Sequence, residues 1–325
     1  MILLAALAGG GMLYYRTCRH RPPAAVETAY ILPESATVSD SPAEVRLGVE
    51  TLRQGERVEV LDRTRSWARV RIPDGRTGWI ELTDILDGAA YEKGQALARE
   101  LAREPAQAAG HTSGLVNLRA EPARDAPQLA QLAANQAVEV FDRRLVERPA
   151  SPGAAPAAEP LRDAWYLVRA GSQVGWLLGR LVTLDIPPAI QQYAQTVNLV
   201  AWLALNTVED DGRAVPQYLA ADRAGTPDCD FTHIRVFTWW SKHQQYVTAY
   251  VESNLAGYFP IRTFQHDGAP HFRLRLEDRA GRKFQKVYRM YDTIVRPLGT
   301  VDGWESDALP APRRGVETHQ QRGRR

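Results

Sequence analysis

The sequence predicts a mainly β protein, with two tandem small barrels joined by a helix and followed by an antiparallel β-meander domain. Three observations support this fold class. Short segments that alternate apolar and polar residues recur along the chain, as is typical of strands with one buried face. A Gly-Trp-aliphatic motif occurs twice, in TGWIEL at 77–82 and in VGWLLG at 174–179. Between the two motifs, residues 89–107 are rich in Ala, Leu, Glu and Arg, which favours a helix.

The first predicted barrel covers residues 26–86. RVEVLDR at 57–63 and WARVRI at 67–72 alternate apolar and polar side chains. PDG at 73–75 is typical of a tight hairpin turn, and GWIEL at 78–82 follows as the returning strand. About five short strands within roughly 60 residues favour a small barrel over an open sheet.

The second predicted barrel, residues 112–186, repeats the first. Residues 117–143 align without a gap to residues 37–63, and AWYLVRAGSQVGWL repeats the earlier SWARVRIPDGRTGWI. The second copy differs by an inserted Pro/Ala-rich loop at 145–162. Internal repetition of this length favours two tandem domains.

Three further segments complete the predicted organisation. Residues 87–111 are expected to form a helical linker, in which Tyr91, Leu97 and Leu101 share one face. Residues 190–300 contain about six strand-like segments separated by polar turns, which predicts an antiparallel β domain. Residues 301–325 are polar and basic and contain prolines, so they are expected to be disordered.

The N-terminal segment, residues 1–25, is predicted to be a hydrophobic anchor or signal segment with a short spacer. Met1 to Tyr15 carries no charged side chain, and the basic RTCRHR follows at once. This run is short for a bilayer crossing, which needs roughly 20 residues. Its length suits a signal peptide, but no basic residue precedes it and no small-x-small cleavage site ends it. An uncleaved anchor is favoured, with a cleaved signal sequence or a buried start as alternatives.

Composition excludes several function classes. The net charge is +2, so the chain is not a polycation built to coat nucleic acid, and no nucleic-acid partner is expected. The only cysteines, Cys18 and Cys229, lie far apart, so a disulfide framework is excluded and both are expected to be unpaired. Motifs of zinc peptidases, serine hydrolases, phosphate loops and Cys-x-x-Cys sites do not occur. No cofactor or metal is expected, and the oligomeric state stays open.

One short segment, DCDFTH at 228–233, is the strongest candidate for catalysis. It brings Cys229 and His233 close together beside two aspartates, and these residue types can form a thiol nucleophile with a histidine base, or part of a metal site. No second cluster with ligand spacing accompanies them. The favoured interpretation is therefore a turn that leads into a strand, with Cys229 packed as a small apolar residue.

The second copy carries the segments NLRAEPA at 117–123, NQAVEVFDR at 135–143 and VGWL at 174–177, which resemble the hallmarks of bacterial SH3 (SH3b) domains. The first copy has TGWI at 77–80 but TVS at 37–39 where the hallmark has Asn-Leu-Arg. The whole chain is similar to a group of membrane-anchored bacterial SH3-repeat proteins with a C-terminal β domain.

That resemblance implies SH3-like folds for both barrels and an extracytoplasmic location in the periplasm or cell envelope. It also implies domains that target cell-wall peptides or serve as adaptors beside a separate enzyme. The basic residues that follow the N-terminal apolar run oppose this location, because positive charge favours the cytoplasmic side of a membrane.

Aromatic and basic residues of the two copies are the candidate binding residues. Trp79 and Trp176 follow a glycine in the last strand and are expected mainly to fill the core. Trp67 and Trp165 suit a core position and a ligand groove equally well. Arg119, in the hallmark segment, can pair with a ligand carboxylate, although a salt bridge within the barrel is favoured.

The C-terminal β domain offers two further candidate contacts. Trp239 and Trp240 are adjacent and point to opposite faces of a strand, so one is expected in the core and the other is a candidate contact. Arg273 and Arg275 form a basic stripe whose intervening positions hold Phe272, Leu274 and Leu276. Such a stripe can bind an anionic polymer, lipid head groups or nucleic acid, but a solvated sheet face is favoured.

The sequence therefore predicts a non-enzymatic, membrane-anchored envelope protein that binds cell-wall peptide, glycan or a partner protein through SH3b-like domains. Two alternatives remain. One is an enzyme with an active site around Cys229 and His233, and the other is a structural scaffold that docks a partner through its β domain. The predicted binding residues are Trp67, Trp79, Arg119, Trp165, Trp176, Trp239 and Trp240.

Overall fold

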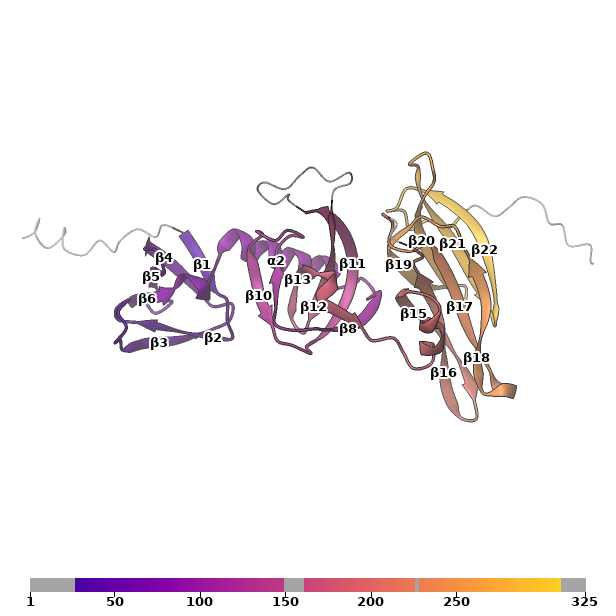
Figure 1. The fold of residues 1–325 in the computed structure, drawn as a ribbon, viewed down its shortest axis with the longest axis horizontal. Coiled ribbons are helices and arrows are strands. Elements are labelled where there is room, and N and C mark those ends of the chain that lie inside the picture. Colours follow the sequence, from indigo (N-terminus) through magenta and orange to yellow (C-terminus); the bar gives the residue numbers. More distant parts are fainter. Residues whose placement is uncertain (1–26, 149–160, 226–227, 311–325) are drawn as a thin grey trace, which may run out of the picture. The chain divides into compact units, whose positions relative to one another are not determined.

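The computed structural model describes residues 27–148, 161–225 and 228–310, and it confirms the mainly β class (Figure 1). All paired strands run antiparallel and form four sheets. The chain divides into two compact units, residues 1–93 and residues 94–325. The predicted N-terminal anchor lies outside the described residues. Among the residues that are described, no helix combines the length and the apolar character needed to cross a membrane.

The first unit is built on one seven-stranded sheet, with the order β3-β2-β6-β5-β4-β1-β7. Every strand contributes to a single apolar core, in which Val58, Val70 and Ile80 are almost completely buried. A short 3₁₀ turn, η1 (Leu82–Asp84), precedes the last strand. The strands are β1 (Glu27–Ile31), β2 (Ser35–Ser39), β3 (Gly48–Arg53), β4 (Arg57–Arg63), β5 (Trp67–Arg71), β6 (Thr77–Glu81) and β7 (Ile85–Asp87).

A second seven-stranded sheet repeats the first strand for strand, in the order β10-β9-β13-β12-β11-β8-β14. Its core includes Leu118, Val140 and Leu177. The predicted loop at 145–162 is shorter than expected because β11 and β12 extend into it, and residues 149–160 lie outside the described part. The elements are β8 (Ala108–Thr112), β9 (Val116–Arg119), β10 (Gln128–Leu132), β11 (Ala137–Glu147), β12 (Arg162–Ala170), β13 (Gln173–Leu178), η2 (Gly179–Leu181) and β14 (Val182–Leu184).

The glycine of each Gly-Trp motif marks a close approach between strands. In the first sheet, a Cβ atom added to Gly78 would lie 2.7 Å from the backbone oxygen of Ser39 on β2. In the second sheet, a Cβ on Gly175 would lie 2.8 Å from the backbone oxygen of Arg119 on β9. Side-chain carbons do not tolerate such distances to backbone atoms. The motif therefore has a glycine because the neighbouring strand leaves no room for a side chain.

The α-helix α2 (Gly88–Leu101) lies inside the predicted linker. Its first half belongs to the first unit, where the Tyr91 ring stacks on Tyr30 with centroids 3.7 Å apart. Its second half belongs to the second unit, where Leu97 and Leu101 pack against the second sheet. The two leucines pack together as predicted, but Tyr91, which was expected to share their face, packs in the first unit instead.

The C-terminal β domain is a pair of four-stranded sheets rather than one meander of about six strands. Each sheet is itself a meander, because its strands neighbour one another in chain order. Leu219 and Val236 of the third sheet and Phe272 and Tyr288 of the fourth belong to one core, so the two sheets pack face to face (Figure 1). The strands are β15 (Leu199–Asp210), β16 (Arg213–Asp222), β17 (His233–Trp240), β18 (Gln245–Glu252), β19 (Gly257–His266), β20 (Ala269–Glu277), β21 (Lys283–Tyr291) and β22 (Ile294–Asp302).

The predicted disorder of residues 301–325 is wrong for their first part. β22 extends to Asp302, and residues 303–310 then follow an irregular path over the fourth sheet. The Trp304 indole donates a hydrogen bond to the backbone oxygen of Leu276, and the Ser306 carbonyl accepts two hydrogen bonds from the sheet. These contacts order the segment despite its polar sequence. Residues 311–325 lie outside the described part.

Candidate functional site

The outer face of β5 and β6 carries the candidate site of the first unit. Alternation along the two strands sends Ala68, Val70 and Ile80 into the core, so Trp67 and Trp79 point outward. Both tryptophans are half-buried. The expectation that Trp79 fills the core is therefore wrong, because Ile80 takes that position.

A cation and an anion accompany the Trp67 ring. The guanidinium carbon of Arg46, on the loop between β2 and β3, lies 4.6 Å from the ring centroid. Arg46 Nη2 is also 3.4 Å from Oε1 of Glu81, the register partner of Trp67 on β6. A cation over an indole face is attracted by the ring quadrupole, an interaction of about 0.5–1 kcal/mol at exposed sites.

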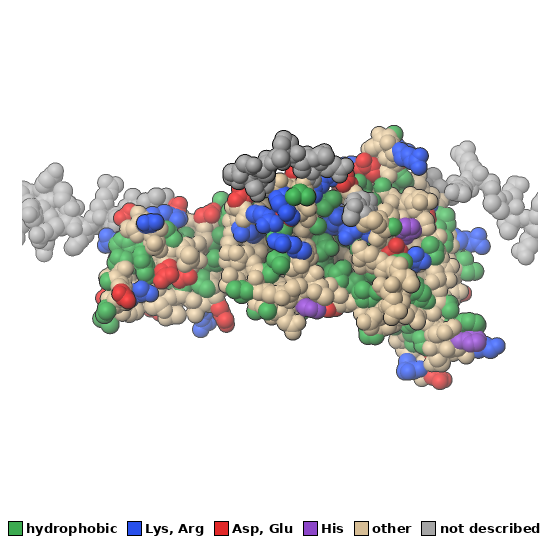
Figure 2. All heavy atoms as spheres, in the orientation of Figure 1, with side chains coloured by type: hydrophobic (Ala, Val, Ile, Leu, Met, Phe, Trp, Pro, Cys, Tyr) green, Lys and Arg blue, Asp and Glu red, His purple; other side chains and the backbone are tan. Residues whose placement is uncertain are grey.

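The same loop exposes two large aliphatic side chains beside Arg46. Val45 is 92% exposed and Leu47 is 75% exposed. On the visible face of the first unit, hydrophobic, basic and acidic side chains are interspersed (Figure 2). We name the following residues of the first unit the Trp67 surface: Val45, Arg46, Leu47, Trp67, Arg69, Trp79 and Glu81.

The equivalent tryptophans of the second sheet, Trp165 and Trp176, are buried. Trp165 is 3% exposed and Trp176 is 2% exposed, and both pack with Phe141, Leu167 and Leu101 of α2. They belong to a cluster separate from the sheet's own core. Trp165 therefore lines no open groove, and Trp176 is buried on the outer face of the sheet, beneath the helix.

Arg119 holds the loop that follows its own strand. Its Nη1 donates a hydrogen bond to the backbone oxygen of Ala126 at 2.6 Å. The predicted partner was a carboxylate of the barrel, but the structure shows a carbonyl in this place. The guanidinium is half-buried and is engaged in closing the β9–β10 loop.

Trp239 and Trp240 differ in burial, as their adjacency in a strand predicts. Trp239 packs on Tyr246, and its Nε1 donates a hydrogen bond to Asp210 Oδ2 at 2.9 Å. That hydrogen bond is the main reason why the pKa of Asp210 is lowered. Trp240 is 44% exposed and rests on the His243 ring, with centroids 3.8 Å apart. Trp240 is therefore the contact candidate of the pair.

Cys229 and His233 do not form a preassembled catalytic pair. Cys229 is buried and unpaired, and burial raises the pKa of its thiol. The His233 Nδ1 lies 2.8 Å from Thr232 Oγ1 and 3.3 Å from Asp222 Oδ1. Because these groups already contact this nitrogen, it is not a free base for the Cys229 thiol. Among the described residues, no group of three or more His, Cys, Asp and Glu side chains is placed to hold a metal ion.

A buried ion pair beside Cys229 was missed by the sequence analysis. The Asp230 carboxylate is 3.2 Å from Arg143 Nη1 on β11, and it accepts a hydrogen bond from the Phe259 N–H at 2.9 Å. Burial raises the pKa of Asp230 to about 6. The pair joins the second sheet to β19, and residues so far apart in the chain give no spacing signal.

Gln107 was missed for the same reason. This completely buried side chain accepts a hydrogen bond from the Ile261 N–H at 2.7 Å and donates one to the Ile261 carbonyl at 3.1 Å. One amide side chain thus pairs with a strand residue as a neighbouring strand would. It fastens the second sheet to the C-terminal domain.

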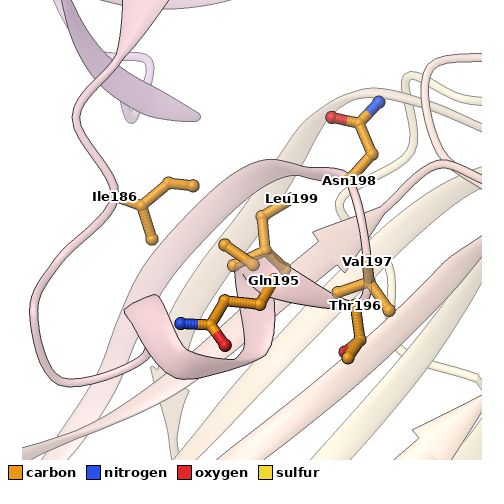
Figure 3. A pocket seen from close by; sticks show the side chains of 7 residues that line it. Ile186, Gln195, Thr196, Val197, Asn198 and Leu199 are labelled. Atoms are coloured by element: carbon orange, nitrogen blue, oxygen red, sulfur yellow. The ribbon is translucent and has the colours of Figure 1, made fainter.

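A hollow of about 380 Å³ opens beside η3 (Gln191–Gln195) and the start of β15. Figure 3 shows Ile186, from the segment that precedes η3, and Gln195 among the side chains around it. Apart from amide and hydroxyl groups, the lining is aliphatic and carries no titratable side chain. This hollow therefore offers no acid, base or nucleophile.

The basic stripe of β20 is not the solvated face that was expected. Phe272 and Leu274 lie in the core, as predicted, which turns Arg273 and Arg275 outward. However, the Arg273 side chain is only 8% exposed, because residues 303–310 cover it. Residues 303–310 therefore occupy the surface that Arg273 and Arg275 form.

Comparison with known proteins gives one family match and several distant structures. The family model of the bacterial SH3 domain matches residues 49–85, which span β3 to β7. No curated protein matches the sequence. NlpC2 and NlpC1 from Trichomonas vaginalis are each 10% identical over 88% of this chain and 100% and 96% of their own, with TM-scores of 0.18 and 0.19. An NlpC/P60 family protein from Bacillus cereus is 12% identical over 83% of this chain and 98% of its own, with a TM-score of 0.19.

These matches correct the prediction of a non-enzymatic adaptor. The solved structures that match carry NlpC/P60 names, so the prediction of a protein that only binds is not kept. The expectation that the chain is not an enzyme is therefore withdrawn. TM-scores below 0.2 show no common overall fold between these structures and this chain, so they indicate no position for a site.

Proposed function

We propose that the chain takes part in processing the bacterial cell wall and that the Trp67 surface holds wall peptide or glycan as substrate. The bacterial SH3 match places β5 and β6 inside a domain type that commonly binds cell-wall components. The single observation that carries the proposal is the half-buried Trp67 ring with Arg46 over its face. An indole face of this kind can stack on a sugar ring or on an apolar side chain.

The charges around the ring fit a wall peptide. Such a peptide carries both carboxylate and amino groups, and the Trp67 surface offers both partners. Arg46 and Arg69 supply guanidinium groups, and Glu81 supplies a carboxylate 47% exposed to solvent. Arginine suits this role because its planar guanidinium binds a carboxylate through two parallel hydrogen bonds.

We include in the proposal that both seven-stranded sheets are SH3-type barrels and that the second has lost its open surface. The shared strand order and the matching close approaches at Gly78 and Gly175 support a common origin. The second copy would then act as a scaffold, with α2 lying where the first copy offers its ligand surface.

The test is co-sedimentation of the full chain with purified peptidoglycan sacculi, combined with measurement of soluble fragments released over time. We expect the wild type to pellet with sacculi and Trp67→Ala to bind about five- to tenfold more weakly, as for an aromatic contact residue. Trp240→Ala is the matched control, because it removes another exposed tryptophan. Equal binding by both variants would place the substrate surface elsewhere, and no binding by the wild type would reject the proposal.

The Cys229 cluster is the second candidate, as a catalytic centre. The observation that favours it is the concentration of perturbed groups, since burial raises the pKa of the Cys229 thiol, of Asp230 and of Asp142. A thiol with a raised pKa needs a base to take its proton before it can attack a carbonyl. If sacculi release fragments, Cys229→Ala should abolish that release, and undiminished release would exclude this centre.

We propose further that residues 1–25 tether the chain to the membrane on its extracytoplasmic side. The apolar run from Met1 to Tyr15 and the resemblance to membrane-anchored SH3-repeat proteins support this. The full chain should then sediment with membranes from lysed cells, whereas a chain that begins at Val26 should stay in the supernatant. Equal distribution of the two would contradict the tether.

A further inference from the structure

The outer face of the fourth sheet is built from cationic and amide side chains. Arg262 lies on β19, Arg273 and Arg275 on β20, and Gln285 on β21, and we call these four residues the arginine face. They point outward because the residues next to them in each strand, such as Ile261 and Phe272, enter the sandwich core. The side chains of Arg273 and Arg275 are only 8% and 16% exposed.

Residues 303–310, which we call the strap, lie on this face and meet it through their backbone. The Ser306 carbonyl accepts hydrogen bonds from Arg273 Nη1 and Gln285 Nε2, both at 2.7 Å. The Asp307 carbonyl accepts one from Arg273 Nη2 at 3.2 Å. One guanidinium fork thus binds two successive carbonyl groups. Contacts of this kind do not depend on the side chains of the bound segment, so another extended peptide can make them.

The acidic side chains of the strap add charge complementarity. Glu305 pairs with Arg275 at 3.1 Å, while Asp307 lies 3.5 Å from Arg273 and 3.8 Å from Arg262. Both carboxylates remain more than 80% exposed, at 82% for Glu305 and 86% for Asp307. Exposed ion pairs contribute little to stability, so these contacts can exchange.

The arginine face, in contrast, is held in position by contacts outside the strap. The Arg273 guanidinium is buried and lies 4.6 Å from the Phe264 ring centroid, which fixes its position. Arg262 is further oriented by two hydrogen bonds to Glu104, at 2.6 and 3.1 Å. Because the strap itself covers Arg273, displacement of the strap exposes a guanidinium that is held in place and can bind another acidic segment.

An aromatic anchor at the start of the strap completes the contact. The Trp304 indole donates a hydrogen bond to the Leu276 carbonyl at 2.9 Å and packs on Tyr258, with ring centroids 4.9 Å apart. The Lys283 ammonium lies 4.5 Å from the same indole. The surface therefore recognises an aromatic residue followed by carboxylates along an extended chain.

We propose that the arginine face is a binding surface for an extended acidic peptide of a partner protein, and that the strap occupies it as an intramolecular competitor. The occupant is peptide because the central contacts are made to consecutive carbonyl groups. It is acidic because three arginines surround those contacts. The inference does not depend on the Trp67 surface or on cell-wall binding.

The test uses the full chain and a fluorescein-labelled peptide with the strap sequence GWESDALP. In one variant the strap is weakened by Trp304→Ala, Glu305→Gln and Asp307→Asn. We expect this variant to bind the labelled peptide at least about tenfold more tightly than the wild type, in which the tethered strap competes at an effective concentration near the millimolar range. Arg275→Gln in the weakened chain should reduce binding severalfold, and thermal melting confirms that each variant folds.

The peptide GWKSKALP is the control for charge and should not bind. Equal binding of the two peptides, equal binding by the wild type and the weakened chain, or no binding by either chain would each overturn the proposal. Vesicles that contain phosphatidylglycerol provide one further arm. If the weakened chain sediments with these vesicles and ignores GWESDALP, the surface binds lipid head groups and the peptide proposal fails.

Discussion

The outer faces of the first and second sheets are built on equivalent strands but end in opposite states. On β5 and β6, Trp67 and Trp79 stay half-buried beside charged residues. On β12 and β13, Trp165 and Trp176 are almost completely buried. The covering element is α2, with Phe141 and Leu167 beside it. Arg69 and Glu81 stand at the first-sheet positions that Leu167 and Leu178 take in the second, so two apolar-to-charged differences go together with an open face.

The same tryptophan pair can therefore be part of the packed interior or of an open surface, depending on what lies over it. A sheet has two faces, and packing of the inner face decides the fold. The outer face can be buried beneath a helix, or it can stay exposed and available to bind a ligand. The following substitutions test whether the two outer faces differ in this way.

The largest expected effect separates the two tryptophan pairs directly. Trp176→Ala should lower the free energy of unfolding by about 3–5 kcal/mol, because it leaves a cavity under α2. Trp79→Ala should cost about 1 kcal/mol or less, since its ring is already half in water. Urea denaturation followed by circular dichroism measures both values. Equal losses would show that the two faces do not differ in the way described.

The fastening of the second sheet to the C-terminal domain provides the next effect. Gln107→Ala should cost about 2–4 kcal/mol, because the N–H and carbonyl of Ile261 would lose their partner while buried. Gln131→Ala is the matched control on β10 and should change stability by less than about 0.5 kcal/mol. The same denaturation measurement applies. A loss no greater than the control's would mean that water replaces the amide at this junction.

The buried Asp230 should make the stability of the second unit depend on pH. Its pKa is raised to about 6, so the folded chain holds this proton more tightly than the unfolded chain. The resulting stabilisation is complete below the ordinary value of 3.8 and is lost as pH rises toward 6. Two pKa units correspond to about 3 kcal/mol.

Asp230→Asn removes this titration. The wild type should therefore lose about 3 kcal/mol relative to the variant between pH 4 and pH 7, as measured by urea denaturation at each pH. Asp228→Asn, at an exposed neighbour, should show the wild-type dependence. A flat difference between the wild type and Asp230→Asn would mean that Arg143 keeps the carboxylate ionised throughout.

The smallest effect tests what the two sheets have in common. Gly78→Ala and Gly175→Ala should each cost about 1–3 kcal/mol, because the new methyl group meets a neighbouring backbone oxygen in both sheets. Gly114→Ala, with no atom within 4 Å of its added Cβ, is the control and should be close to neutral. Thermal melting is sufficient here. A cost at only one of the two glycines would contradict the equivalence of the sheets.

Local pattern was enough to predict many of the strands and part of the core of the first and last domains. Alternation identified Val58 and Val70 in the first copy and Phe272 and Leu274 in the last domain, and the helix face with Leu97 and Leu101 followed from its spacing. These features depend on neighbours in sequence. The class of the fold was therefore accessible before any coordinates.

Burial of the outer faces could not be predicted, because it depends on elements that are distant in the chain. Alternation showed that Trp165 and Trp79 share strands with core residues, but not that α2 covers one and leaves the other open. The pairing of Gln107 with Ile261 and the strap over Arg273 are likewise contacts between remote segments. Their residue types are ordinary, so no motif marks them.

The Gly-Trp motif places opposite demands on adjacent residues. The glycine touches the backbone of the neighbouring strand and admits no side chain, whereas the tryptophan points away from the core and is constrained only by what lies outside. A Gly-Trp pair therefore combines a fixed inner contact with an outer ring whose role depends on its cover, which is a helix in the second sheet and solvent with charged side chains in the first.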